Sequence, residues 1–323
     1  MLSLRLNCAS LTRLTAGVAR LSSAAATDIP ILGQLYPRDQ ITNVTPAILD
    51  KIQRRLHLQP SHPLGILRTV IEGHYPTFTH ISSLSPVVTP ERNFDSLSFP
   101  ADHPGRSAVD SYYINREFML RTHTSAHQVE TFTKGERRWV LTADVYRRDE
   151  IDACHYPVFH QMEGASLFYR DEASMQRLEE ENACLLKDLK GENIIVEDVP
   201  CSSTTNPVQT AHERRHAELV ANNLKLSLNS LMLALFGRRE DEPLRVRWIE
   251  AYFPFTSPSY EVEVFFNGKW LEILGCGVVL QSILDQSSKR VYYFRWCAWS
   301  CIQRQMFQIA LDGHLALASN ESP

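Results

Sequence analysis

Three polar clusters lie close together within residues 121–163, in sequence that is otherwise apolar and rich in strand-forming residues. They read RTHTSAHQ at 121–128, DVYRRDEIDACHYP at 144–157 and FHQMEG at 159–164. Arginine, histidine, glutamine and glutamate side chains are costly to bury without a partner. Their concentration in strand-like sequence therefore predicts a pocket that holds a small charged ligand together with an anion.

Gln161 and Glu163 stand two residues apart in the third cluster. Successive residues of a strand point to opposite faces of the sheet, so these two side chains are expected on one face. An amide and a carboxylate side by side provide hydrogen-bond acceptors for a cationic group. The alternative interpretation is a solvated edge of the sheet.

Composition limits the classes of protein to which the chain can belong. Its 323 residues suit one large or two modest domains, and 44% hydrophobic residues can form a sizeable core. A formal net charge of −4 gives no global field that attracts nucleic acid, so RNA binding would need a local basic patch. The seven cysteines are scattered without a C-x-x-C, which indicates free thiols in a reducing compartment.

Residues 1–27 have a composition of their own. Arg5, Arg13 and Arg20 are the only charged residues before Asp28, and serine, threonine and alanine are abundant. This pattern is typical of a mitochondrial transit peptide, with a disordered N-terminal tail as the alternative. No apolar run of about 18 residues follows, so we expect no membrane span.

The elements that must position the polar clusters show both helical and strand-like patterns. Helices are expected over 45–56, 65–75, 171–190 and 211–237, strands over 140–146, 159–163, 246–252, 260–266 and 269–277, and loops over 84–107 and 191–210. Asn267-Gly268 predicts a tight hairpin, and the 171–190 helix is expected to pack on the sheet. Helices before and between antiparallel strands predict an α+β domain, not a doubly wound parallel sheet. Neither GxGxxG nor GxxxxGK[ST] occurs, which excludes the two standard phosphate loops.

The segments RTHTS, VYRRD, FHQMEG, YFPF and WLEILGCG occur in this order. Together they resemble the catalytic domain of phenylalanyl-tRNA synthetases over about residues 60–285, and the transit-like start points to the single-chain mitochondrial form. The resemblance implies the class II fold, an antiparallel sheet flanked by helices. It implies a monomeric ligase of the mitochondrial matrix, without a membrane partner, that uses ATP and Mg²⁺. Such an enzyme activates phenylalanine as the adenylate and transfers it to the 3′ end of phenylalanine tRNA.

The resemblance also implies roles for the charged residues. Arg147 matches the arginine of the second class II motif, which clamps the α-phosphate, as suits a planar guanidinium. His155 matches a position that faces the nucleotide phosphates. Gln161 and Glu163 match the residues that hold the α-ammonium group of the amino acid. The alternatives are a surface arginine and an ordinary loop histidine.

Five further residues match the amino-acid site. His123, Ser125 and Gln128 correspond to positions near its polar end, although purely structural hydrogen bonds are the alternative. Phe253 and Phe255 are two residues apart in YFPF and are expected against the phenyl ring of the substrate. The alternative for these two is ordinary core packing.

The sequence departs from the family after residue 285. The resemblance implies a third motif, a glycine-rich strand followed by a helix with a G-x-x-R arginine, and residues 286–323 contain no G-x-G-x-x-R. We interpret this segment as an atypical tail that arises from alternative splicing or a frame error. We therefore expect the loss of a central strand, an exposed sheet edge and little or no adenylation activity. The expected organisation is a transit peptide at 1–27, a partial catalytic domain at 28–285 and the tail, with no anticodon-binding module.

Two other functions remain open at this point. The missing motif favours a non-catalytic binding protein derived from a synthetase. A class II-like ligase for another carboxylate is the second alternative, against which FHQMEG and YFPF argue. The resemblance also places a magnesium-binding acid at Glu272, although a hairpin glutamate is more often solvated.

Overall fold

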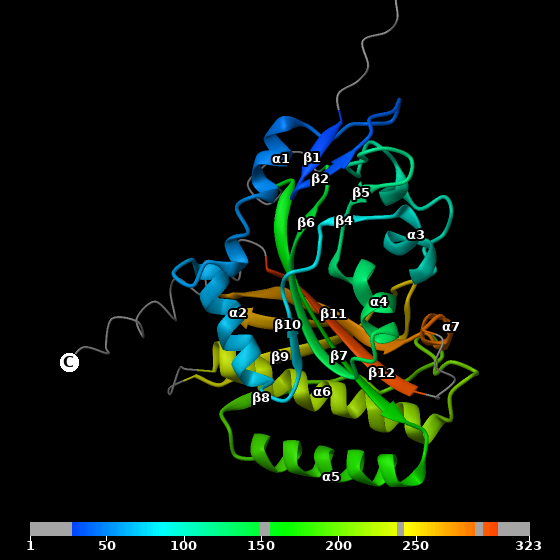
Figure 1. Cartoon of the computed structure of the whole chain (residues 1–323). Helices are drawn as coiled ribbons and strands as arrows, with labels where there is room; N and C mark the ends of the chain where they lie inside the picture. The colour runs from blue at the N-terminus through cyan, green and yellow to red at the C-terminus, as the bar shows by residue number, and fades with distance from the viewer. Residues whose placement is uncertain (1–27, 149–155, 238–241, 288–292, 303–323) are drawn as a thin grey trace, which may run out of the picture.

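An eight-stranded sheet forms the centre of the chain. The computed structural model describes residues 28–148, 156–237, 242–287 and 293–302, the last of these by its backbone (Figure 1). The strands are β3 (Thr79–Ile81), β6 (Arg138–Tyr146), β7 (Val158–Tyr169), β8 (Ile194–Glu197), β9 (Leu244–Glu250), β10 (Thr256–Phe266), β11 (Lys269–Val279) and β12 (Tyr293–Ile302). Their order in space is β3-β6-β7-β12-β11-β10-β9-β8. Only the two outermost pairs, β3 with β6 and β8 with β9, are parallel, so the predicted α+β class is confirmed.

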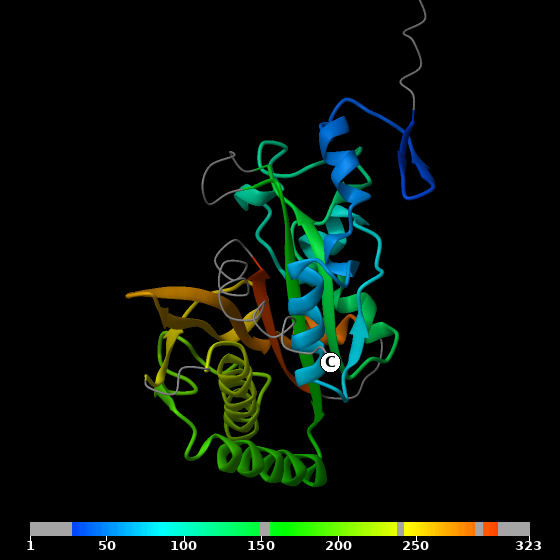
Figure 2. The same ribbon diagram turned by 90° about the vertical axis from the view of Figure 1, so that its left-hand side faces the viewer.

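Two helices cover one face of this sheet. Helices α2 (Pro63–His74) and α6 (Arg214–Phe236) pack on β6, β7, β10 and β11 in the larger hydrophobic core. Helix α5 (Glu172–Leu189) lies outside α6 in both views (Figures 1 and 2), and Asn182 on α5 donates to the Leu219 carbonyl of α6 at 3.0 Å. The expectation that this helix packs on the sheet is therefore wrong for most of its length, because α6 separates it from the strands.

The opposite face carries short helices and loops. The 3₁₀ turn η4 (Thr124–His127), α4 (Gln128–Thr133) and α7 (Gln281–Asp285) lie there. Phe132 of α4 and Ile283 of α7 join Leu141 of β6 and Phe255 in a second core. The segment 84–107, predicted to be a loop, holds short elements: the two-residue strand β4 (Val87–Val88), the helix α3 (Pro90–Asn93) and the 3₁₀ turns η2 (Asp95–Leu97) and η3 (Pro104–Arg106). Gln161 and Glu163 of the third cluster point to this face, where Ser125 and Gln128 of the first cluster bond to Glu163.

A smaller N-terminal layer closes the end of the sheet. It consists of the hairpin β1 (Ile29–Ile31) and β2 (Gln34–Tyr36), helix α1 (Pro46–Ile52) and the turn η1 (Leu56–Leu58), and the ladder β4 (Val87–Val88) with β5 (Met119–Leu120) lies nearby. The Thr45 side chain caps α1 by accepting from the Ile48 amide. Pro46 follows at the first helical position, so this predicted helix begins where its capping residues indicate.

The strongest predicted turn is also present. Asn267 and Gly268 join β10 to β11 with φ of 49° and 80°, the backbone that a two-residue hairpin turn requires. The predicted strands 246–252, 260–266 and 269–277 lie within or overlap β9, β10 and β11. In Figure 2 the orange β10–β11 hairpin extends away from the helices.

Two strands of the central sheet lie where the sequence predicts a loop or an atypical tail. Residues 191–210 were expected to be a loop, but Ile194–Glu197 forms the parallel edge strand β8. Residues 293–302 form β12, which pairs with β7 on one side and with β11 on the other. The expected loss of a central strand and the expected exposed edge are therefore wrong, because this segment of the tail fills the centre of the sheet.

Helix α6 is long and apolar enough to pass a length and composition test for a membrane span. Two thirds of the apolar window, 67%, is buried inside the molecule, as expected of a helix in the core of a folded domain. The predicted transit peptide, residues 1–27, lies outside the described residues.

Candidate active site

Asn93 anchors the segment that enters the site. Its side-chain oxygen accepts from the Thr122 amide at 3.0 Å, and its side-chain nitrogen donates to Thr122 Oγ1 at 2.8 Å. Asn93 is fully buried at the end of α3. The proline-rich loop and the RTHTS segment are thus held together, which orients η4 over the sheet.

Gln161 and Glu163 share one face of β7, as predicted. They pair with Ala143 and Leu141 of β6, and both of those residues belong to the second core. Glu163 is fully buried and Gln161 is 3% exposed, so the alternative of a solvated edge is wrong. Together they form a polar patch in an apolar surface, which we call the β7 floor.

The turn η4 and helix α4 close over the β7 floor. The Thr124 amide donates to Gln161 Oε1 at 3.1 Å, and Ser125 Oγ donates to Glu163 Oε2 at 3.0 Å. Gln128 Nε2 donates to the other Glu163 oxygen. Neutral donors thus fix the orientation of the buried carboxylate, whose negative charge would favour a cationic ligand group.

Arg147 lies on the same side of the sheet. Its guanidinium is 5.2 Å from the centre of the Phe159 ring, and Phe159 is two residues before Gln161 on β7. Its Nε donates to the Thr122 carbonyl at 3.1 Å. Within the described ranges no ion pair includes Arg147, so the remaining donors of this half-buried group can face an anion.

His123 connects the charged and aromatic parts of the site. Its ring stacks on Phe99 with centroids 5.5 Å apart and 10° between the planes. Burial, assisted by the positive charge of Arg147, lowers the pKa of His123 to about 3. The imidazole is therefore neutral near pH 7 and does not add to the positive charge at Arg147.

Phe253 and Phe255 form an aromatic wall beside this histidine. Their ring centroids are 6.2 Å apart, and Phe255 lies 5.8 Å from Phe99. Phe255 is buried and Phe253 is half-buried in the second core. Phe99 was missed from the sequence as a wall residue, because the loop that carries it shows no strand or helix periodicity.

Arg121 has a structural role behind the floor. Its guanidinium forms an ion pair with Asp144 and donates to the carbonyls of Leu84 at 3.1 Å and Ser85 at 2.9 Å. Although burial raises the pKa of Asp144, Arg121 and the Tyr146 hydroxyl hold it below its usual value. Protein groups therefore already use the donors of this arginine, which is buried.

The same guanidinium sets the tautomer of His127. An arginine can only donate, so Nε2 of His127 accepts from Arg121 at 3.0 Å and the ring proton lies on Nδ1. Nδ1 is 3.5 Å from Glu130, which also pairs with Lys134 at 2.8 Å. Burial lowers the pKa of His127 to about 4, so the neutral ring links η4 to the buried pair.

Glu272 is exposed on β11, opposite Glu263 of β10. Glu263 pairs with Arg247, whereas burial and the charges of Glu272 and Glu263 raise the pKa of Glu261. Across the part of the chain that is described, no group of three histidine, cysteine or acidic side chains could hold a metal ion. Glu261 and Glu272 are two nearby carboxylates. Such a pair suits a Mg²⁺ ion whose other ligands are nucleotide phosphates and water, because this ion keeps several of its waters. His155 lies outside the described residues.

The family described as tRNA synthetases class II core domain (F) matches residues 53–200 and 215–299. The chain belongs to this class II tRNA synthetase family. Mitochondrial phenylalanine–tRNA ligase of Rattus norvegicus is 41% identical over 80% of this chain and 53% of its own length. The enzyme of the same name from Saccharomyces cerevisiae is 40% identical over 83% of this chain and 65% of its own length. The chain thus spans about half to two thirds of the length of these relatives.

A pyrrolysyl-tRNA synthetase structure from Desulfitobacterium hafniense has a TM-score of 0.44 at 12% identity. The superposition covers 85% of this chain and 82% of that chain, and so distant a likeness adds nothing to the assignment. The class II core match extends to residue 299 and therefore includes most of β12. This synthetase domain brings eight of the nine predicted site residues to one side of the sheet: His123, Ser125, Gln128, Gln161, Glu163, Phe253, Phe255 and, over the Phe159 ring, Arg147.

Proposed function

We propose that this chain is a phenylalanine–tRNA ligase domain that acts in the mitochondrial matrix as a monomer. The names of its relatives support the substrate and the compartment. The observation that carries the proposal is a buried carboxylate and amide on one strand face, on the side of the sheet that also carries a half-buried arginine and an aromatic wall. This arrangement suits an amino acid with an apolar aromatic side chain.

In the first step, one oxygen of the phenylalanine carboxylate attacks the α-phosphorus of ATP. A P–O bond forms to the carboxylate as the bond to the β-phosphate oxygen breaks, which yields the aminoacyl adenylate and pyrophosphate. Glu163 and Gln161 hold the α-ammonium group, and Phe253 and Phe255 contact the phenyl ring. Arg147 neutralises charge on the α-phosphate, so catalysis rests on positioning and electrostatics, without a protein nucleophile.

In the second step, a ribose hydroxyl at the 3′ end of phenylalanine tRNA attacks the acyl carbon. The new ester forms as AMP leaves with the electron pair of the mixed anhydride. The buried floor keeps the amino acid fixed through both steps, because Ser125 and Gln128 hold the Glu163 carboxylate in place. Mg²⁺ bound with ATP would neutralise phosphate charge, and Glu261 and Glu272 are the residues that would hold it.

Phenylalanine-dependent exchange of pyrophosphate into ATP tests the proposal directly. We expect exchange with phenylalanine, and a loss of about a hundredfold in kcat/KM for Glu163→Gln, because a charge-assisted bond to the ammonium is removed. Glu117→Gln, at an exposed position outside the site, serves as the control. Equal kcat/KM for wild type and Glu163→Gln would contradict the assigned role.

A second candidate is a phenylalanine-binding protein without ligase activity. The observation that favours it is the lack of a G-x-G-x-x-R in residues 286–323. Calorimetric binding of phenylalanine without pyrophosphate exchange would identify this function. A calorimetric screen of other amino acids separates both candidates from a ligase for a different carboxylate.

A further inference from the structure

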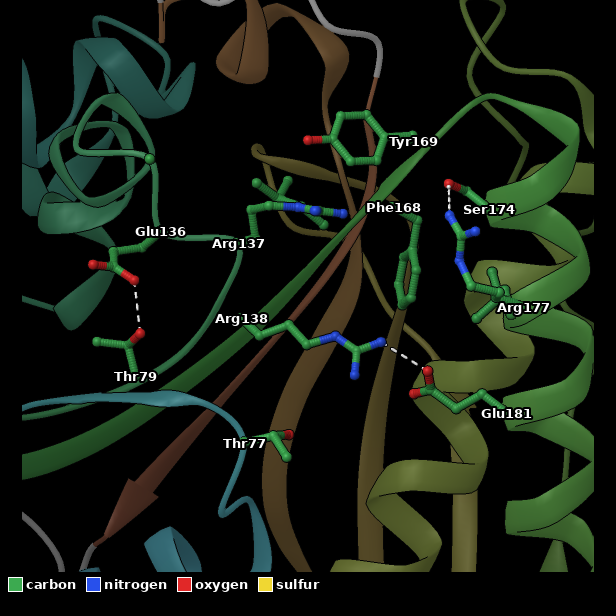
Figure 3. A pocket seen from close by; sticks show the side chains of 13 residues that line it. Thr77, Thr79, Glu136, Arg137, Arg138, Phe168, Tyr169, Ser174, Arg177 and Glu181 are labelled. Atoms are coloured by element: carbon green, nitrogen blue, oxygen red, sulfur yellow. Dashed lines mark hydrogen bonds and ion pairs between the residues drawn. The ribbon is translucent and has the colours of Figure 1, made fainter.

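A second pocket, of about 520 Å³, lies at the far end of β6 and β7 (Figure 3). Its walls come from the start of β3 and the residues just before it, the start of β6, the end of β7 and the first three turns of α5. The volume lies within the range of small-ligand sites, about 300–1,000 Å³. We call it the arginine pocket, after the three arginines that line it, Arg137, Arg138 and Arg177.

The arginine pocket is separate from the β7 floor. Leu167 lines the pocket and stands four residues beyond Glu163 on the same strand. At about 3.3 Å per residue, the two sites are about 13 Å apart along β7. No step of the proposed ligase reaction uses this pocket, so the inference does not depend on that reaction.

Two of the three guanidiniums can accept a new anion. Arg137 lies over the Tyr169 ring at 4.1 Å, a contact that uses its face and leaves its N–H edges available. Arg177 donates to Ser174 Oγ at 2.8 Å, which uses one of its five donors. In the described segments no ion pair includes Arg137 or Arg177, and both are exposed.

The carboxylates of the pocket already have neighbours. Glu181 pairs with Arg138 at 2.7 Å, and Glu136 accepts from Thr79 Oγ1 at 2.7 Å (Figure 3). Asp171, just outside the pocket, caps α5 by accepting from the Ser174 amide at 2.8 Å. Three arginines and two glutamates line the pocket, and the Asp171 carboxylate acts on Arg177, so the attraction for an anion comes from guanidinium donors of Arg137 and Arg177 that no ion pair uses among the described residues.

We propose that the arginine pocket binds a phosphate group, from either an RNA strand or a free nucleotide. Guanidiniums match the paired oxygens of a phosphate and bind it more strongly than neutral donors do. Tyr169 lines the same pocket and is only half-buried, so the ring face away from Arg137 could stack on an attached base.

Binding of two probes, inorganic phosphate and a short single-stranded RNA, tests this site. We expect Arg137→Gln/Arg177→Gln to bind at least one probe about tenfold or more weakly than wild type does. If RNA occupies the pocket, the slope of log affinity against log salt falls by about 1.4 for two lost phosphate contacts. Weakened binding of phosphate alone identifies a free phosphorylated ligand.

Arg245→Gln is the matched control. Arg245 is an exposed arginine with one carboxylate partner, Glu197, and it lies on β9, five strands away from β6. At about 4.8 Å per strand this places it about 24 Å from the pocket. We expect Arg245→Gln to leave both affinities and the salt slope unchanged.

Glu136→Gln is expected to tighten binding, a result that a misfolded variant could not give. The amide can still accept from Thr79, but the negative charge beside the arginines is gone. We expect phosphate to bind about two- to fivefold more tightly, as for other exposed charge pairs. The proposal is overturned if neither probe binds the wild-type chain, or if the double arginine variant binds both probes as wild type does.

Discussion

Two arginine–carboxylate pairs, each with one member on β6, show how burial changes the role of the same chemistry. Arg121 and Asp144 lie behind the β7 floor, with side chains 2% and 7% exposed. Arg138 and Glu181 line the arginine pocket, with side chains 36% and 38% exposed. The buried pair holds η4 and the loop 84–107 in place, whereas the exposed pair leaves its surroundings accessible to solvent and ions.

The two sites differ in the same way. On the β7 floor, backbone and side-chain donors already hold Gln161 and Glu163, so little reorganisation is needed when a ligand ammonium arrives. In the arginine pocket, exposed guanidiniums attract an anion electrostatically, and dissolved salt screens this attraction. The β7 floor is therefore suited to selecting one ligand, whereas the arginine pocket is suited to binding an anion.

Breaking the buried pair has the largest expected effect. We expect Arg121→Met to lower the free energy of unfolding by about 3–5 kcal/mol, because it leaves the Asp144 carboxylate buried without its cation. Urea unfolding of the purified chain measures this loss. The double variant Arg121→Met/Asp144→Leu should recover part of it, and additive single effects would show that the two residues do not act as a pair.

Arg147→Lys separates charge from geometry at the proposed phosphate clamp. Lysine keeps the charge but lacks the planar fork that binds two oxygens. We expect kcat for pyrophosphate exchange to fall by about a hundredfold, equivalent to about 2.7 kcal/mol, while phenylalanine binding changes little. A raised Kd for phenylalanine with unchanged kcat would place Arg147 at the amino acid instead.

Acidification should lower the stability of the fold through its buried histidines. His160 pairs with Asp144 across β6 and β7, and burial lowers its pKa to about 4, compared with about 6.5 in an unfolded chain. The unfolded chain thus binds the proton first, so the stabilisation is complete above about pH 6.5 and is lost as the pH falls towards about 4. Each such histidine contributes up to about 1.4 kcal/mol per pH unit in this window.

The urea midpoint, measured from pH 7 to pH 4, checks this slope. His160→Gln should flatten it by the contribution of one group. His80→Gln, at an exposed histidine bonded to the Tyr75 carbonyl, provides a control for the substitution itself. Identical slopes for wild type and His160→Gln would show that His160 does not contribute.

Local signals predicted much of this molecule. The cap and proline of α1, the Asn267-Gly268 turn and the shared face of Gln161 and Glu163 depend on residues adjacent in sequence, and the structure confirms all three. The α+β class followed from the same short-range patterns.

What the sequence analysis missed depends on distant contacts. Asn93 meets Thr122 across 29 residues, and Arg121 meets Asp144 across 23. Strand β8 is only four residues long and exists through its pairing with β9. The position of β12 likewise follows from β7 and β11 on either side, which no pattern within residues 286–323 reveals.

Breaking the exposed pair has the smallest expected effect and completes the comparison. Arg138→Met removes the bond to Glu181 but leaves that carboxylate in contact with solvent. We expect the free energy of unfolding to fall by less than about 1 kcal/mol, the usual range for exposed ion pairs. The same arginine-to-methionine change at Arg121 should cost several times more. If urea unfolding gave equal losses for Arg121→Met and Arg138→Met, burial would not be what distinguishes the two regions.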